Sequence, residues 1–114
     1  MAISNRIKND LISLIISQID AVVLGFDGTP ATNDDGGAGR PAITLTPIVS
    51  QIDETTILIE ASLPINEAFT DTIKEVVLLS STTNGFSTIA RYNTRPIVKT
   101  TQNEVKIEVS IEVI

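Results

Sequence analysis

The clearest pattern of apolar and polar positions lies at the end of the chain. From Val105 to Val113 the odd positions carry Val or Ile, and the even positions from Glu104 to Glu112 carry Glu, Lys or Ser. Such alternation sends the two sets of side chains to opposite faces of a sheet, because successive residues of a strand point in opposite directions. The pattern predicts a long strand over 104–113.

Residues 3–19 follow a helical pattern instead. Apolar residues recur at intervals of three and four, which places them on one face of a helix. Additional Ile residues widen this face beyond what one contact needs; the apolar positions are Ile3, Ile7, Leu11, Ile12, Leu14, Ile15, Ile16 and Ile19. Two interpretations stay open: the helix covers one face of a sheet, or it packs partly on another subunit.

The rest of the chain predicts further strands. Residues 20–26 and 73–79 are apolar on both faces and read as central strands. Pro47 cannot donate to a ladder, so its strand is expected to lie at an edge or to carry a bulge. Asn84-Gly85 favours a turn, and Pro96 is expected to interrupt the chain before a short strand. The predicted strands are 20–26, 43–50, 55–63, 73–79, 86–92, 97–99 and 104–113.

One helix and six to eight antiparallel strands predict a mainly β fold. We expect a single domain over 1–114, an antiparallel β-sandwich (20–114) with one N-terminal α-helix (1–19).

The stretch 27–42 is rich in Gly, Pro, Asp and Asn, and predicts a long loop. It is interpreted as a flexible connection, as a contact loop that orders against a neighbour, or as a calcium site. Asp27, Asn33, Asp34 and Asp35 offer the oxygen ligands that Ca²⁺ prefers, although their spacing does not match the EF-hand pattern.

Composition excludes several classes of function. The formal net charge of −6 argues against nucleic acid and anionic membranes as partners. The chain has no Cys and no His, which excludes disulfides, thiol nucleophiles and His-based acid–base catalysis. No apolar run is long enough for a membrane span, and we expect no signal peptide.

Charged residues offer little that resembles a catalytic site. Glu104, Glu108 and Glu112 share a strand face with Lys106, which is read as a solvated face or as a subunit contact. Arg91, Arg95 and Lys99 form a small basic group that could pair with such a face on a neighbour. Phosphate-binding glycine motifs are absent. We therefore expect no enzyme activity, no catalytic residue and no cofactor.

Several short segments resemble tail and baseplate proteins of tailed bacteriophages. The similarity begins at Leu24-Gly25 and Thr29–Asp34 and covers most of the chain from about residue 22 onward. It is carried further by Ile73–Leu79, Asn84-Gly85, Thr88–Arg91, Pro96–Thr100 and the alternating strand that follows. Val77 stands where that family usually has Gly, and Leu79 where it usually has an aromatic residue.

The resemblance implies a structural protein of the virion, in the tail, the baseplate or a fibre attachment, made in the host cytoplasm. Partners would be other copies of the chain, as a trimer or ring, and other tail proteins. A carbohydrate-binding or adhesive β-sandwich is the alternative, although aromatic residues are scarce. The residues expected at interfaces are Ile3, Ile7, Leu11, Ile12, Ile16, Asn33, Asp34, Asp35, Arg40, Arg91 and Arg95.

Overall fold

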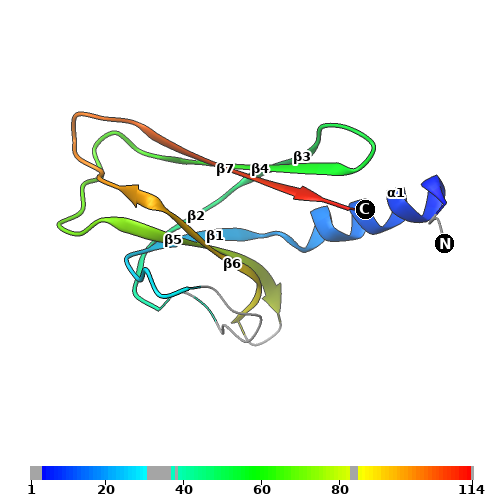
Figure 1. Cartoon of the computed structure of the whole chain (residues 1–114), viewed down its shortest axis with the longest axis horizontal. Helices are drawn as coiled ribbons and strands as arrows, with labels where there is room; N and C mark the ends of the chain where they lie inside the picture. Colours follow the sequence, from blue (N-terminus) through cyan, green and yellow to red (C-terminus); the bar gives the residue numbers. More distant parts are fainter. Residues whose placement is uncertain (1–3, 31–36, 38, 83–84, 114) are drawn as a thin grey trace.

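The chain folds into two antiparallel sheets with one helix at the N-terminal end, as a computed structural model shows (Figure 1). The structure describes residues 4–30, 37, 39–82 and 85–113. One sheet has the strand order β2-β1-β5-β6 and the other the order β3-β4-β7. The predicted mainly β sandwich with one N-terminal helix is confirmed.

Helix α1 (Asn5–Gln18) begins where the sequence offers a cap. The Ser4 hydroxyl accepts a hydrogen bond from the backbone N–H of Ile7 at 3.3 Å, which satisfies one of the free donors of the first turn. The helix ends at Ile19, a β-branched residue with extended backbone that leads directly into the first strand. Figure 1 shows α1 projecting past the ends of the strands, and the molecule extends 48 Å along its longest axis.

The first sheet is built around two central strands. β1 (Ala21–Gly25) lies between β2 (Pro41–Leu45) and β5 (Ile73–Thr82), and β6 (Gly85–Ile97) pairs with the other edge of β5. Every residue of β1 is buried, as its continuous apolar run predicts for a strand covered on both faces.

The second sheet is smaller and contains the final strand. β4 (Thr56–Leu63) pairs with β3 (Ile48–Gln51) on one side and with β7 (Val105–Glu112) on the other. The predicted hairpin between β3 and β4 and the predicted final strand are both confirmed. Along β7 the even-numbered side chains are exposed, whereas the odd-numbered ones are buried or half-buried.

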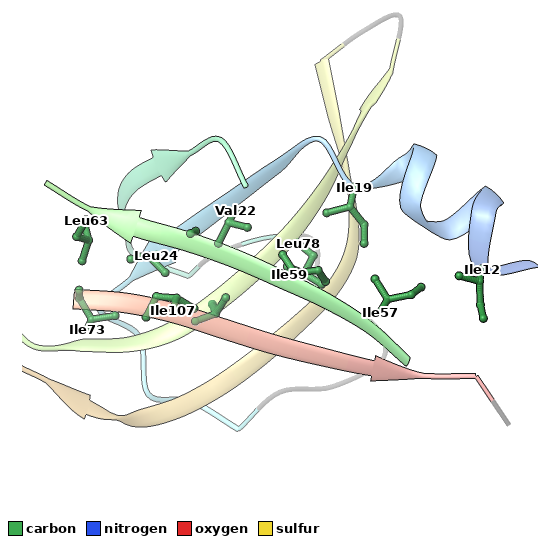
Figure 2. Packing of buried hydrophobic residues seen from close by; sticks show 12 residues of the cluster. Ile12, Ile19, Val22, Leu24, Ile57, Ile59, Leu63, Ile73, Leu78 and Ile107 are labelled. Carbon is green, nitrogen blue, oxygen red and sulfur yellow. The ribbon is translucent and has the colours of Figure 1, made fainter. Parts of the chain in front are cut away.

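The core lies between the two sheets. Figure 2 shows Val22, Leu24 and Leu78 of the first sheet packing against Ile57 and Ile59 of the second. Each such side chain contributes about 1.5–3 kcal/mol when it is removed from water. Aliphatic packing of this kind therefore supplies most of the stability; the buried cluster is Ile12, Ile19, Val22, Leu24, Ile57, Ile59, Ala61, Leu63, Ile73, Val76, Leu78 and Ile107.

Two predicted strand boundaries around proline are wrong. The single strand expected over 43–50 is split: β2 pairs with β1 in the first sheet, and the chain crosses at Pro47 to form β3 in the second. In contrast, Pro96 does not interrupt its strand, and β6 continues through it to Ile97. β6 is an edge strand, so one side of its backbone needs no partner and a missing N–H is tolerated there.

Two further boundaries also move. The loop predicted over 27–42 ends earlier, because β2 already begins at Pro41. A turn was expected at Asn84-Gly85; strand β5 continues to Thr82 and β6 begins at Gly85, and Asn84 lies outside the described residues. Gly85 has φ +124°, a conformation that favours glycine.

Candidate assembly surface

Helix α1 has two apolar faces. Ile12, Ile16 and Ile19 point toward the sheets, and Ile12 is 0% exposed. Leu11 and Leu14 lie roughly 130° further round the helix at 3.6 residues per turn, together with Ile7. These three side chains are 38%, 57% and 41% exposed, respectively. The apolar stripe of α1 is therefore wider than its own core requires, because only the part that contains Ile12 and Ile16 packs against the sheets.

The exposed face of α1 continues into a groove beside the first sheet. Leu14 and Ile15 of the helix line it on one side, and Ile89 of β6 lines it on the other, around a volume of about 450 Å³. At the floor the Ser80 hydroxyl donates to the Gln18 side-chain oxygen at 3.0 Å, which fixes the end of the helix against β5. The candidate assembly surface consists of the exposed side chains Ile7, Leu11, Leu14 and Ile89 together with the half-buried Ile15.

A buried carboxylate holds the loop that follows β1. Glu75 on β5 is 0% exposed, and its two oxygens accept hydrogen bonds from the backbone N–H groups of Asp27 (2.6 Å), Gly39 (2.8 Å) and Arg40 (3.3 Å). Gly25 stands opposite Glu75 in the sheet, where a Cβ would lie 2.7 Å from the carboxylate. The missing side chain thus makes room for the group that anchors both ends of the loop.

Arg91 completes this anchor from the neighbouring strand. Its Nε donates to Glu75 at 3.2 Å, and its Nη1 and Nη2 donate to the backbone carbonyls of Thr29 (2.9 Å) and Asp27 (3.2 Å). The side chain is only 3% exposed. Since an isolated charge is costly to bury, the ion pair and the carbonyl bonds together make its position possible.

A second buried cation holds the loop between β4 and β5. Lys99 is 1% exposed, and its ammonium donates to the backbone carbonyls of Ile65 (3.2 Å), Glu67 (2.6 Å) and Thr100. All three of its protons are therefore used, which satisfies a lysine that carries three donors and no acceptor. Both this loop and the one after β1 are held by charged side chains.

Three surface carboxylates are stabilised in their ionised form. Hydrogen bonds from the Thr29 hydroxyl and N–H, aided by the charge of Arg91, hold the pKa of Asp27 below its ordinary value of 3.8. The N–H of Thr55 lowers the pKa of Asp53 in the same way, and the N–H of Thr72 that of Asp71.

These lowered pKa values predict a loss of stability in acid. A carboxylate with a depressed pKa in the folded state takes up protons more readily in the unfolded state, so its contribution is complete at neutral pH and is lost as pH falls below about 4. We expect the free energy of unfolding of the Asp27→Asn variant to fall less steeply than that of the parent chain between about pH 4 and pH 2. Urea unfolding at a series of pH values measures both slopes, and equal slopes would contradict the role of Asp27.

The structure separates the predicted interface residues into three groups. Ile7, Leu11 and Arg95 are exposed, as is the Arg40 side chain, which forms a 2.7 Å ion pair with Asp71. Ile12, Ile16 and Arg91 are instead part of the chain's own packing, so the structure assigns them to the fold. Ile3, Asn33, Asp34 and Asp35 lie outside the described residues.

The predicted basic group of Arg91, Arg95 and Lys99 is not a group in space. Arg91 binds Glu75 and Lys99 binds backbone carbonyls, whereas Arg95 is exposed. Sequence reasoning also missed Leu14 and Ile89 as surface residues and Glu75 as an anchor. The sequence signal for this anchor is weak, because Glu75 stands beside a second charge, Lys74, at the start of the apolar stretch 76–79.

The described part of the chain contains neither a metal-binding cluster nor a membrane-spanning helix. Over those residues no group of three or more Asp or Glu side chains is arranged to hold a metal ion. The described portion likewise contains no helix long and apolar enough to cross a membrane.

Comparison with known proteins identifies no relative. No protein-family model, no curated protein and no solved structure matches this chain.

Proposed function

We propose that this chain is a structural component of a tailed-bacteriophage virion, in the tail, the baseplate or a fibre attachment, and that it acts by assembly. Its partners are other copies of itself and other tail proteins. The placement in a virion rests on the sequence resemblance of the segments around Ile73–Arg91. The assembly role has separate support in the structure.

The observation that carries the assembly role is the second apolar face of α1. A helix that only covered its own sheet would expose polar side chains on the opposite side. Here Leu14 is 57% exposed and adjoins an apolar groove. Contiguous exposed apolar surface rimmed by polar residues marks interaction sites in monomeric domains. Burial of Ile7, Leu11 and Leu14 against a neighbouring molecule would favour association, and it would require no change in the fold of the chain.

The rigidly held loops support the same role. Glu75 and Arg91 fix both described ends of the loop after β1, and Lys99 fixes the loop before β5. Loops held in one conformation bind with a smaller loss of entropy than mobile ones. A scaffold with fixed loops and an exposed helix face suits a protein that must form the same contacts in every copy.

A charge placed on the exposed helix face tests the assembly role. We expect Leu14→Asp to weaken self-association by about tenfold or more, because a carboxylate would be buried in an apolar contact. Sedimentation velocity over a range of concentrations measures the association. Ser13→Asp is the control for charge, since it adds the same carboxylate at an exposed position on the polar side of α1.

Two results would overturn the proposal. A parent chain that stays monomeric at all concentrations and binds glycans would indicate the adhesive alternative. Equal association of the Leu14→Asp and Ser13→Asp variants would show that the helix face is not the contact. Cryo-electron microscopy of phage particles that carry a tagged copy of the chain tests the virion location directly.

A further inference from the structure

Four strands form the edges of the two sheets, and three of them carry features that discourage pairing with another chain. β2 begins with Pro41, and its pairing with β1 shifts register between Leu24 and Gly25 of β1. β6 contains Pro96 and two register shifts, and β3 has only 4 residues. Prolines, bulges and short length are the usual protections of sheet edges.

β7 is the exception among the four edge strands. It has 8 residues, no proline and an unshifted register with β4 from Leu63↔Val105 to Thr56↔Glu112. Just beyond it, the backbone N–H of Val113 donates to the Thr55 carbonyl at 2.7 Å. Backbone groups of successive residues in a strand point to opposite sides, so the odd residues of β7 bond to β4 and the even residues present their N–H and C=O groups at the free edge.

The free edge of β7 borders an open side of the sandwich. A groove of about 440 Å³ lies between β6 and β7, with Tyr92 and Ile97 on one wall and Ile107 and Val109 on the other. Val109 and Ile111 are half-buried although their side chains belong to the core-facing set. An added strand at this edge would cover the groove and complete their burial.

The charges and the length of β7 together favour one register for a pair of β7 strands. In an antiparallel pair of two β7 strands, residues with like charges must not stand directly opposite one another. A register centred on Glu108 would oppose Glu108 to Glu108, and one centred on Lys106 would oppose Lys106 to Lys106. A register centred on Ile107 would place Lys106 opposite Glu108 of the other copy, but it would pair only residues 105–109 of β7. A register centred on Val109 also opposes unlike charges, with Lys106 opposite Glu112 of the other copy twice by symmetry, and it pairs the longer stretch 106–112.

We propose that the β7 edge pairs antiparallel with β7 of a second copy, centred on Val109, so that the two smaller sheets join into one continuous sheet. The contact is isologous, as expected of a two-fold pair. In the single chain Lys106 binds Glu60 (2.5 Å) and Glu108 (3.3 Å), whereas Glu112 forms no ion pair within the described residues. The proposed register gives Glu112 a cation. The inference rests on the proposed assembly role and names one of its contacts.

Exchange of the charges tests the register. We expect Lys106→Glu to weaken the dimer about tenfold or more, because two attractive pairs become repulsive. Adding Glu112→Lys should restore association, since the pairs are then re-formed with reversed sign. The matched control is Lys106→Glu with Glu108→Lys, which has the same composition and should remain weak. Sedimentation equilibrium of the full chain at low salt measures all three; rescue by the control instead would overturn the register.

The backbone gives an independent test. We expect Ser110→Pro to abolish pairing while the fold is retained, because the N–H of an even residue is not used by β4. Ser110→Ala keeps the N–H and is the control. In amide exchange followed by NMR, Lys106, Glu108, Ser110 and Glu112 should become protected as the concentration rises, and Ile107 and Val109 should be protected throughout.

The results separate this inference from the proposed assembly role. If the Leu14→Asp variant dissociates and Ser110→Pro does not, the β7 contact is wrong and assembly through α1 stands. If Ser110→Pro dissociates and Leu14→Asp does not, the β7 contact stands and the helix contact is wrong. Unchanged exchange of the even-numbered amides at high concentration would also overturn the β7 contact.

Discussion

Replacement of Glu75 by glutamine is expected to lower the free energy of unfolding by about 3–5 kcal/mol, the range seen when one partner of a buried ion pair is removed. Arg91 is 3% exposed, so it would keep its charge without the carboxylate that balances it. A glutamine also presents an NH₂ group, which cannot accept a hydrogen bond from the N–H groups of Asp27, Gly39 or Arg40. Loss of this anchor should therefore destabilise the sheet and release the loop together.

Urea denaturation measures the stability of the Glu75→Gln variant, and amide exchange at Asp27 and Gly39 measures the release of the loop. Arg40→Gln is the control, because it breaks an ion pair with Asp71 in which the Arg40 side chain is 61% exposed. Exposed pairs contribute about 0–1 kcal/mol. A Glu75→Gln variant no less stable than this control would show that the anchor does not hold the fold.

Replacement of Lys99 by methionine is expected to cost about 3 kcal/mol, although methionine fills nearly the same volume. The ammonium binds the carbonyls of Ile65, Glu67 and Thr100, and the side chain is 1% exposed. With methionine these carbonyls lose their buried donor, and a thioether cannot replace it.

Lys106→Met is the control for Lys99→Met. Both variants lose one positive charge, but only Lys99→Met also removes a buried hydrogen-bond donor. Lys106 is 52% exposed in its ion pairs with Glu60 and Glu108, so its replacement should change the stability of the single chain far less than that of Lys99. Thermal and urea unfolding at low protein concentration compare the two variants. Similar losses for both would show that Lys99 acts only through its charge.

The sequence predicted the fold well where burial alone decides structure. The alternation of β7 and the apolar runs of β1 and β5 correspond directly to one-sided and two-sided burial. The helix was predicted for the same reason. In each case the pattern belongs to a single element and does not depend on which element packs against it.

Predictions failed where the outcome depends on distant partners. Pro47 and Pro96 look alike in sequence, yet one marks a crossing between sheets and the other lies within an edge strand. Arg91 and Lys99 were expected in a small basic group that could pair with a neighbour, but both side chains are buried. Their burial depends on Glu75 and on the carbonyls of a loop, which only the folded chain brings together.

The sequence predicted Ile7 and Leu11 of the candidate assembly surface, but it did not predict Leu14 or Ile89. The width of the stripe on α1 raised the possibility of a second contact, but the sequence could not divide it into the face that packs inward at Ile12 and the face that remains exposed at Leu14. That division depends on how the helix leaves β1. Ile89 belongs to the candidate surface because β6 lies beside α1. The two segments are far apart in the chain, so the sequence pattern does not show that they are neighbours.

The order of strands in the two sheets also constrains how a newly made chain can fold. In the first sheet β1 pairs with β2 and β5, and in the second sheet β4 pairs with β7. Neither sheet is therefore complete until residues late in the chain have been synthesised. Pairings between distant segments are slow, since loop closure must precede the contacts that reward it. During that interval β4 is paired with β3 alone, and its other edge has free backbone groups, which favour aggregation. We therefore expect translation products that stop before β7 to be recovered as aggregates or bound to chaperones.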